Sequence, residues 1–281
     1  MNMSLDLWSP YFLGQLKFAA IAMAGGLVLE TVLPGTGKRS YKALAFNLVV
    51  AFIFLYLTTL LVPPLSALLD PVRANLSLAI PIRFPDGLLG SLLQTLAFFF
   101  LFDFFFYWWH RAQHSNGLLW AQHKFHHQEQ WVNVTTVHRY HFSEEMFRVF
   151  VVYLPLAVLF DFKPVTVGWI WTAFTLWGYW IHLNVRVDLR GLGKWISGPQ
   201  FHRHHHAPEF EHRNYAAFFP IWDRVFGTYH HPERNFFPER TGVTGEGAGN
   251  TFYEAIVYPF VEWARSSYRA VRLAFARMHR V

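Results

Sequence analysis

Residues 88–127 read LLGSLLQTLAFFFLFDFFFYWWHRAQHSNGLLWAQHKFHH and join an apolar segment to a histidine-rich one. Its first part, Leu88 to Trp109, is apolar and aromatic, carries one charge at Asp103, and is long enough to cross a bilayer core as a helix. Its last part is polar and contains five histidines in two groups with helical spacing. The stretch therefore predicts a membrane helix that leads directly into a histidine-rich polar region.

The composition of the whole chain also indicates a membrane protein. Of its 281 residues, 53% are hydrophobic, 19% aromatic and 15% charged, whereas a soluble domain carries roughly 25% charged residues. The absence of cysteine excludes disulfides, iron–sulfur clusters and thiolate zinc sites. A formal net charge of +6 beside long apolar runs favours an anionic membrane surface as a partner and argues against nucleic acid.

Four apolar stretches predict an all-α fold, an integral membrane helical bundle. Three are single segments, and the fourth is divided by Asp161–Pro164 into the two arms of a helical hairpin, so that we expect about four spans. The segments are Tyr11–Leu33, Ala43–Leu69, Leu88–Trp109, and the arms Val149–Phe160 and Val165–Ile181. We expect three parts of the chain: N-terminal transmembrane helices in residues 1–94, a histidine-rich region in residues 95–245, and a C-terminal helix in residues 246–281.

The charges beside these segments predict their orientation. Lys38, Arg39 and Lys42 form a basic cluster in the first short loop, which the positive-inside rule assigns to the cytoplasm. Counting crossings from there places His110 and the polar residues 183–245 on the cytoplasmic side, where the latter should form a helical cap. The C-terminal helix carries Arg265, Arg269 and Arg272 on one face opposite apolar residues, a pattern that suits either the membrane interface or packing on the cap.

Fifteen of the 16 histidines lie between His110 and His231, which predicts a metal site. Three boxes and the isolated His182 supply nine candidate ligands, namely His110, His114, His123, His126, His127, His182, His202, His205 and His206, and His141 is a further candidate. A closed zinc site takes about four ligands, so nine fit two metals of higher coordination number. Imidazole suits iron, zinc, copper and nickel, and the spacing alone leaves the metal open.

Two classes of protein remain after the usual motifs are considered. The chain has a single Glu-x-x-His, at Glu209–His212, and no His-Glu-x-x-His, which excludes the soluble di-iron bundles and the zincin proteases. A metalloenzyme is one possibility, and a membrane protein that binds or transports metal ions through its histidines is the other. A transporter should place ionisable residues inside its spans, whereas these spans are nearly free of charge, so the enzyme is favoured.

Further motifs carry a resemblance to a known family. They are the three histidine boxes after a hydrophobic helix, Tyr107-Trp-Trp-His-Arg111, Arg139-x-His-x-x-Glu144, His182-Leu-Asn184, and Trp222-Asp-Arg-x-Phe-Gly-Thr228. Together they resemble the fatty acid hydroxylase/sterol desaturase superfamily, which comprises integral membrane non-haem di-iron oxygenases. The resemblance covers the sequence from about residue 95 to about residue 230. Phe142 departs from the pattern, because it stands where the family has a proline.

The resemblance implies a function and its cofactors. It implies O2-dependent hydroxylation or desaturation of a lipid, which would be a sterol, a fatty acyl chain or a related membrane lipid. Two iron ions, Fe2+ or Fe3+, held by the histidines would form the metal centre, with O2 as co-substrate. Residues 95–245 would then be the catalytic region, facing the cytoplasm from a bacterial inner membrane or an ER-type membrane.

Four polar residues are candidates to hold the second ring nitrogen of a metal-bound histidine, as such ligands require. Asp103 lies seven residues before His110 and therefore on the same face of the predicted helix. The other three candidates are Glu144, Asn184 and Asp223.

The electrons for O2 must come from outside the chain, because it has no cysteine and no Gly-x-Gly-x-x-Gly fingerprint. We expect a redox carrier such as cytochrome b5 or ferredoxin, together with its reductase. An acidic carrier would be steered to positive charge on the cap. The candidates for that contact are Lys124, Arg139, Arg186, Arg190, Lys194 and Arg203.

Overall fold

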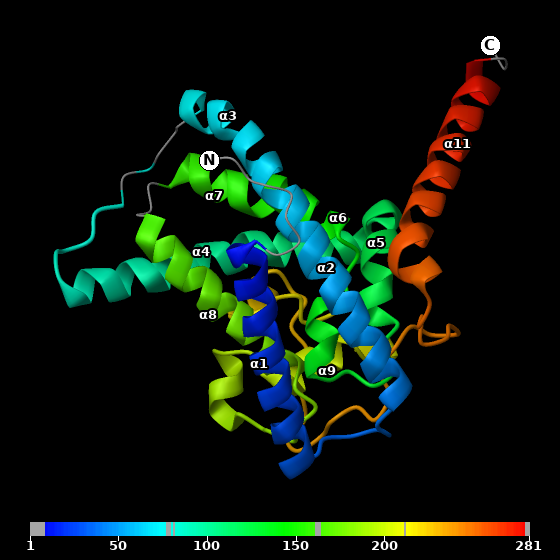
Figure 1. Ribbon diagram of the computed structural model, residues 1–281, viewed down its shortest axis with the longest axis horizontal. Helices are drawn as coiled ribbons and strands as arrows, with labels where there is room; N and C mark the ends of the chain where they lie inside the picture. Colours follow the sequence, from blue (N-terminus) through cyan, green and yellow to red (C-terminus); the bar gives the residue numbers. More distant parts are fainter. Residues whose placement is uncertain (1–8, 77–79, 81, 161–163, 211, 279–281) are drawn as a thin grey trace.

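The computed structural model describes residues 9–76, 80, 82–160, 164–210 and 212–278. Within these ranges the chain is helical, with no strand and only two isolated bridges between extended residues. The expected all-α class is therefore confirmed (Figure 1).

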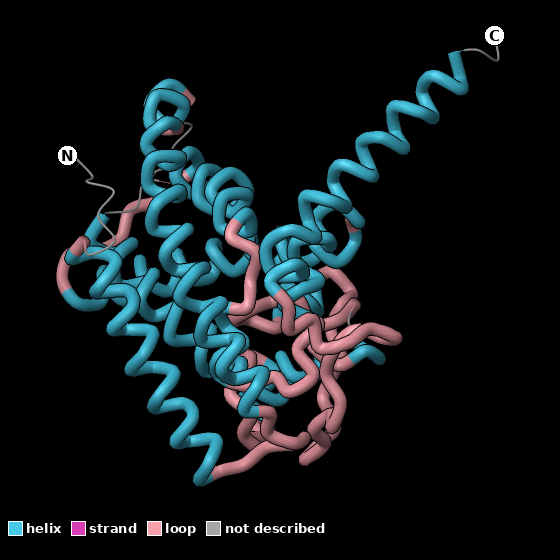
Figure 2. Tube along the Cα trace, turned by 45° about the vertical axis from the view of Figure 1, so that its right-hand side comes forward, coloured by secondary structure: helices cyan, strands magenta, loops and turns pink. Residues whose placement is uncertain are grey.

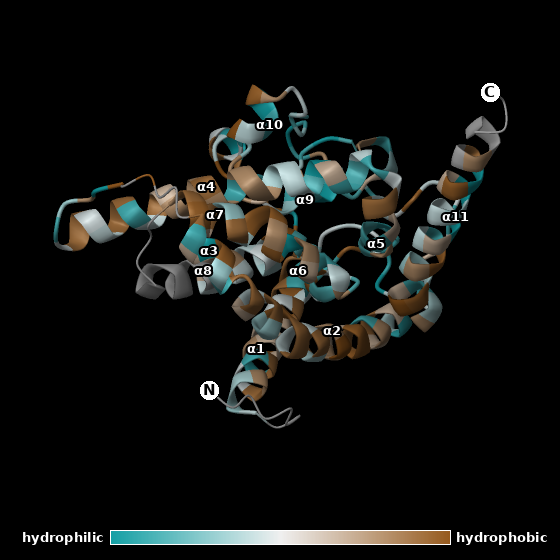
Figure 3. Ribbon diagram, turned by 90° about the horizontal axis from the view of Figure 1, so that it is seen from above, coloured by the Kyte–Doolittle hydropathy of each residue, from teal (hydrophilic) through white to brown (hydrophobic). Residues whose placement is uncertain are grey.

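Three long helices match the predicted single segments. They are α1 (Pro10–Val32), α2 (Tyr41–Leu68) and α4 (Leu88–Ser115), and the short α3 (Asp70–Asn75) continues from α2. Ser9 and Ser40 cap the first two by accepting backbone N–H groups. Among the described residues these three, with α3 joined to α2, are the helices long and apolar enough to cross a membrane. Figure 3 shows α2 as largely hydrophobic along its length.

The predicted hairpin is present as two helical arms. The first runs through α6 (Ser143–Arg148), the π-helical turn η2 (Val149–Tyr153) and α7 (Leu154–Leu159), and the second is α8 (Pro164–His182). The turn that we placed at Asp161–Pro164 lies largely outside the described residues. Because α8 packs against α1 and α4, it brings His182 to the end of α4.

The polar part of the chain gathers at one end of the molecule, where Figure 2 shows most of the loops. Its helices are short because glycines, prolines and polar side chains interrupt every apolar run. They are α5 (Gly117–His127), η1 (Val134–His138), η3 (Arg190–Lys194), α9 (Pro199–His205), η4 (Pro208–Phe210) and α10 (Ile221–Val225). We call residues 183–245 the cap, as in the sequence analysis.

The predicted C-terminal helix consists of the π-helical turn η5 (Tyr253–Val257) and α11 (Tyr258–Met278). Its first turns pack on α5, where the Trp263 indole donates to the Leu118 carbonyl oxygen at 2.8 Å. Its later turns project away from the rest of the molecule, with Tyr268, Val271 and Phe275 exposed (Figures 1 and 2). Packing on the polar region therefore accounts for the beginning of this helix only.

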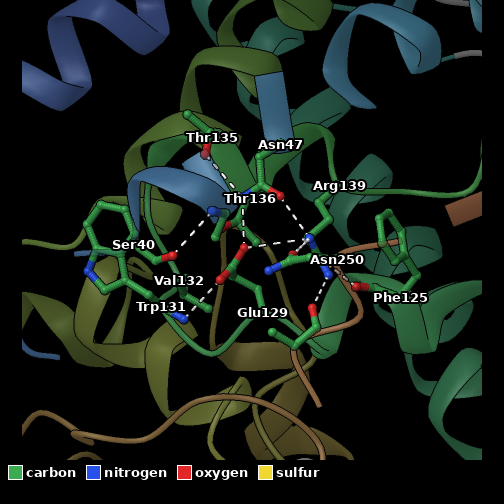
Figure 4. A network of polar contacts seen from close by, with 12 residues as sticks. Ser40, Asn47, Phe125, Glu129, Trp131, Val132, Thr135, Thr136, Arg139 and Asn250 are labelled. Atoms are coloured by element: carbon green, nitrogen blue, oxygen red, sulfur yellow. Dashed lines mark hydrogen bonds and ion pairs between the residues drawn. The ribbon is translucent and has the colours of Figure 1, made fainter. Parts of the chain in front are cut away.

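A buried polar network joins α2 to the segment after α5 (Figure 4). The Asn47 amide donates to Glu129 at 2.7 Å and accepts from Arg139 at 2.8 Å, and the Arg139 guanidinium also donates to the Phe125 carbonyl oxygen at 3.0 Å. Arg139 is 0% exposed. Burial lowers its pKa to about 10, so it stays charged at neutral pH. Because Phe125 lies between the histidines of α5, the network fixes the helix that carries them.

Replacing Arg139 with methionine should lower the free energy of unfolding by about 3–5 kcal/mol, because Glu129 would remain buried without the guanidinium 3.7 Å away. Denaturant unfolding in detergent micelles measures the change. Arg265→Met is the matched control, since its ion pair with Glu262 is largely exposed and should contribute less than about 1 kcal/mol. Equal stability of the two variants would contradict a structural role for the network.

Candidate metal centre

Four helix ends bring the nine predicted ligands together. The end of α4 carries His110 and His114, α5 carries three histidines, α8 ends at His182, and α9 with its C-cap carries three more. All nine side chains are buried. A membrane helix therefore delivers its last turn directly into a water-excluded cluster of imidazoles.

The nine histidines form two groups, within each of which the ligand atoms lie within 4.8 Å of one another. The first group is His110, His114, His123, His127 and His205, and the second is His126, His182, His202 and His206. Residues four apart share a helix face, which explains the pairs 110/114, 123/127 and 202/206. As a result α5 and α9 each supply ligands to both groups.

The hydrogen bonds around the first group leave lone pairs facing each other. His110 Nδ1 lies 2.7 Å from the Tyr215 carbonyl oxygen, and His205 Nδ1 lies 2.7 Å from that of Arg213. A carbonyl oxygen only accepts, so each ring uses its single N–H there and its Nε2 carries a lone pair. These two Nε2 atoms are only 2.9 Å apart. Such an arrangement is repulsive unless a cation lies close to both atoms.

The second group has the same property. His182 Nδ1 faces the Gly178 carbonyl oxygen at 2.7 Å, and its Nε2 lies 3.0 Å from His202 Nε2 and 3.3 Å from His126 Nε2. Nitrogens bound to one metal at about 2.0–2.1 Å are separated by about 3 Å when they are neighbours in its coordination sphere. The distances in this group are therefore those of ligands around one ion.

Burial keeps these imidazoles in the form that binds metals. It lowers the pKa of His123, His126 and His127 well below the ordinary value, and the neighbouring histidines lower it further. Burial and neighbouring histidines likewise lower the pKa of His202, His205 and His206, which lie on α9 and at its C-terminal end. The rings are neutral at pH 7, and ring nitrogens of His114, His123, His127 and others have no hydrogen-bond partner within the described structure. The residues present thus fit bound metal ions.

Glu144, one of the four polar candidates, contacts the ligand candidate His123. Its carboxylate lies 3.1 Å from His123 Nδ1 and accepts from the Gln113 amide at 2.7 Å. Burial raises the pKa of Glu144 above its ordinary value, and the hydrogen bond donated by Gln113 opposes that shift by stabilising the carboxylate. The contact directs His123 Nε2 toward the first group.

The other three polar candidates do not contact a histidine ligand. Asp103 accepts the backbone N–H groups of residues 217–219, and its place on the His110 face of α4 was therefore misleading. Asp223 accepts from the backbone of Tyr215 and Ala216, while Asn184 contacts the backbone of Thr36. Asp223 therefore acts through Tyr215, whose carbonyl oxygen faces His110.

His141, the tenth candidate, lies outside both groups. Its Nδ1 is 2.6 Å from the Ser143 hydroxyl and its Nε2 is 3.2 Å from the Ile256 carbonyl oxygen, so both ring nitrogens have partners. His204 is also absent from the groups, because its ring packs against Phe210 and Phe236 on the far side of α9.

Tyr140 is a site residue that the sequence analysis missed. Its ring stacks on His126 with 4.1 Å between centroids, and its hydroxyl is 3.2 Å from His126 Nε2. It also lines a small apolar pocket with Phe54, Phe142 and Phe252. Its position between two quoted motif residues, Arg139 and His141, was the one available signal.

Three of the six predicted carrier-contacting cations have internal partners and do not form a surface. Lys124 pairs with Glu246 at 3.0 Å, Arg139 belongs to the buried network, and Arg203 donates to the Pro238 carbonyl oxygen at 2.7 Å. Arg186, Arg190 and Lys194 are exposed. The sequence shows that these six residues are cationic, but it does not show which of them have internal partners and which are exposed.

Comparison with known proteins agrees with this site. The profile of the fatty acid hydroxylase family matches residues 95–228, which include all nine ligand candidates. An alkylglycerol monooxygenase from Danio rerio is 36% identical over 123 residues, covering 43% of this chain and 27% of the relative. Residues 95–228 form a domain of the fatty acid hydroxylase/sterol desaturase superfamily.

Two other members of the superfamily are similar over longer segments. Ornithine lipid hydroxylase OlsE from Rhizobium tropici is 32% identical over 162 residues, covering 56% of this chain and 47% of the relative. Lathosterol oxidase from Mus musculus is 26% identical over 149 residues, covering 53% and 49%. The chain thus spans about a quarter to a half of the length of these relatives. No solved structure matches it.

Replacing Glu144 with glutamine should weaken metal retention by roughly 10- to 100-fold, because His123 would lose the carboxylate that orients it. The measurement is metal loss from the purified protein against increasing chelator. Glu209→Gln, an exposed carboxylate outside both groups, is the control. Unchanged retention in Glu144→Gln would show that the contact does not support the metal centre.

Proposed function

We propose that the protein is a membrane-bound oxidoreductase that hydroxylates or desaturates a lipid with O2, using two iron ions held by the nine histidines. The observation that carries the proposal is the division of nine buried imidazoles into two groups whose ring nitrogens converge. The names of the relatives, which include a monooxygenase, a hydroxylase and an oxidase of lipids, support the reaction class.

Bound irons would supply the redox chemistry, which is the reduction of O2 and the removal of hydrogen from an unactivated C–H bond. The chain itself contributes geometry and exclusion of water. The Tyr215, Arg213 and Gly178 carbonyl oxygens and Glu144 fix the second nitrogen of four ligands, which sets the direction of each lone pair. Tyr140 places a hydroxyl beside the second group, where it can hydrogen-bond to a bound reactant.

Apolar residues on two sides of the centre are consistent with a lipid substrate. Phe106 packs beside His110 with 5.6 Å between ring centroids, and Tyr140 joins the centre to the apolar pocket at α2 and η5. Most of the aromatic run in α4, including Phe98, Phe99 and Phe102, forms a packed core with Val152 and Leu156. We therefore assign to that run a structural role and to the vicinity of Tyr140 the approach of the lipid chain.

We infer that the centre faces the cytoplasm. The basic loop between α1 and α2 is hydrogen-bonded to the cap, since Gly35 N donates to the Asn184 carbonyl oxygen at 2.8 Å and Thr36 donates to that of Pro238 at 3.0 Å. The loop and the cap therefore lie on one side of the membrane, and the positive-inside rule assigns that side to the cytoplasm.

Purified protein should contain two tightly held irons per chain, and His114→Ala should lose metal and all turnover because it removes one ligand from the first group. The measurement is elemental analysis, combined with mass spectrometry of lipids from a deletion strain and its complement. Products should be about 16 Da heavier or 2 Da lighter, the mass changes for adding oxygen or removing two hydrogens.

His230→Ala is the matched control, because His230 contacts neither group. Full activity of His114→Ala would overturn the di-iron assignment. Labile zinc in place of iron, with no lipid change, would instead favour a metal-binding or transport protein.

The iron-loaded protein in lipid should be silent with NAD(P)H alone, because the sequence contains no site that stores or relays electrons. Adding a redox carrier such as cytochrome b5 or ferredoxin with its reductase should start the reaction. The test is incorporation of label from 18O2 into lipid. Robust incorporation without a carrier would reveal a redox site within this chain.

A further inference from the structure

A pocket lined by cations lies between η3 and the loop at residues 231–236, apart from both histidine groups. Its volume is about 350 Å³, and Arg190, Lys194 and Arg234 line it together with Asp188 and His231. None of the nine ligand candidates lines the pocket. The metal centre therefore does not account for these charges.

The two walls of the pocket are held in place by one carboxylate. Asp188 accepts the backbone N–H of Arg190 at 2.7 Å and that of Asn235 at 3.3 Å. Both residues have left-handed backbones, with φ of 50° and 59°, a conformation that non-glycine residues adopt rarely and at a cost. Gln200 of α9 adds a second link by donating to the Glu233 and Phe236 carbonyl oxygens. These hydrogen bonds hold together the two segments that carry Arg190, Lys194 and Arg234.

The lining of the pocket has a net positive charge, because it contains three cations and one carboxylate, Asp188. Arg190, Lys194 and Arg234 form no ion pair with a described carboxylate. Asp188, the acidic residue of the lining, already has both oxygens engaged by backbone N–H groups. A concave site with this net positive charge suits a compact anion with several oxygen acceptors, which is the chemistry of a phosphate group.

Two exposed apolar side chains beside the cations favour a lipid headgroup over free phosphate as the bound group. Leu192 of η3 is 64% exposed and Trp195, which follows η3, is 60% exposed. Exposed indoles next to arginine and lysine are typical of the level of lipid headgroups in membrane proteins. We propose that this pocket binds the phosphate of an anionic phospholipid, with Arg190, Lys194 and Arg234 as its contacts. The proposal is independent of the oxygenase reaction.

The experiment compares phospholipid retention in three full-length proteins, wild type, Arg190→Gln/Lys194→Gln/Arg234→Gln, and Arg265→Gln/Arg269→Gln/Arg272→Gln. The last triple variant removes the same charge from one face of the projecting helix α11. It controls for general attraction of the protein to an anionic membrane surface, as distinct from binding in the pocket. Each protein is purified from nanodiscs of phosphatidylcholine with and without phosphatidylglycerol, and bound lipid is counted by native mass spectrometry. A second arm measures thermal stability with inorganic phosphate and no added phosphatidylglycerol.

Retention of phosphatidylglycerol by the pocket variant should fall at least about tenfold, while the α11 variant stays near wild type. Stabilisation by inorganic phosphate that is lost in the pocket variant, without any preference for phosphatidylglycerol, would assign the pocket to free phosphate and overturn the lipid source. Equal retention in all three proteins, or equal loss in both variants, would show that the pocket does not bind the phosphate of a lipid.

An acidic protein is the competing occupant of the same cations. Slower carrier-driven reduction in the pocket variant with unchanged lipid retention would favour it and contradict the proposal. Arg234→Gln alone, in an exposed loop, repeats the comparison if the triple variant does not purify.

Discussion

Buried imidazoles whose lone pairs face one another lie where the ends of four helices meet. A neutral histidine has one N–H and one lone pair, and backbone carbonyl oxygens use the N–H of His110, His182 and His205. Their remaining nitrogens therefore point at other nitrogens in a buried space. This arrangement is favourable only when positive charge lies between the nitrogens, so the histidine cluster is suited to bind cations.

The helices are arranged to impose that geometry. The α4 helix carries its apolar turns and its two ligand candidates on one continuous axis, and α8 packs against it and brings His182 to the second group. The buried contacts of Asp103 and Asp223 with backbone N–H groups shape the segment at residues 214–219, which places the Tyr215 carbonyl oxygen against His110. Two carboxylates that contact no histidine ligand candidate thus help to set the orientation of His110.

The sequence predicted which histidines come together, because helical spacing is local information. Helical spacing of three and four residues places histidines on one face, and apolar length identifies the three long helices. The roles of Asp103, Asn184 and Asp223 were predicted wrongly, since their partners are backbone groups of loops whose path no periodicity reveals. The same limit applies to Arg139 and Arg203, whose burial depends on neighbours that are remote in the chain. Tyr140 was missed because a single tyrosine has no spacing that marks it as the neighbour of a histidine, and only its place between Arg139 and His141 indicated it.

The sharing of α5 and α9 between the two groups has a consequence for assembly. His123 and His127 belong to one group and His126 to the other, and His205 is separated in the same way from His202 and His206. When an ion bound to one group fixes the rotation of α5 or α9 about its axis, it also fixes the histidines that this helix gives to the other group. Acquisition of the two ions should be cooperative, and a singly loaded intermediate should be scarce at equilibrium.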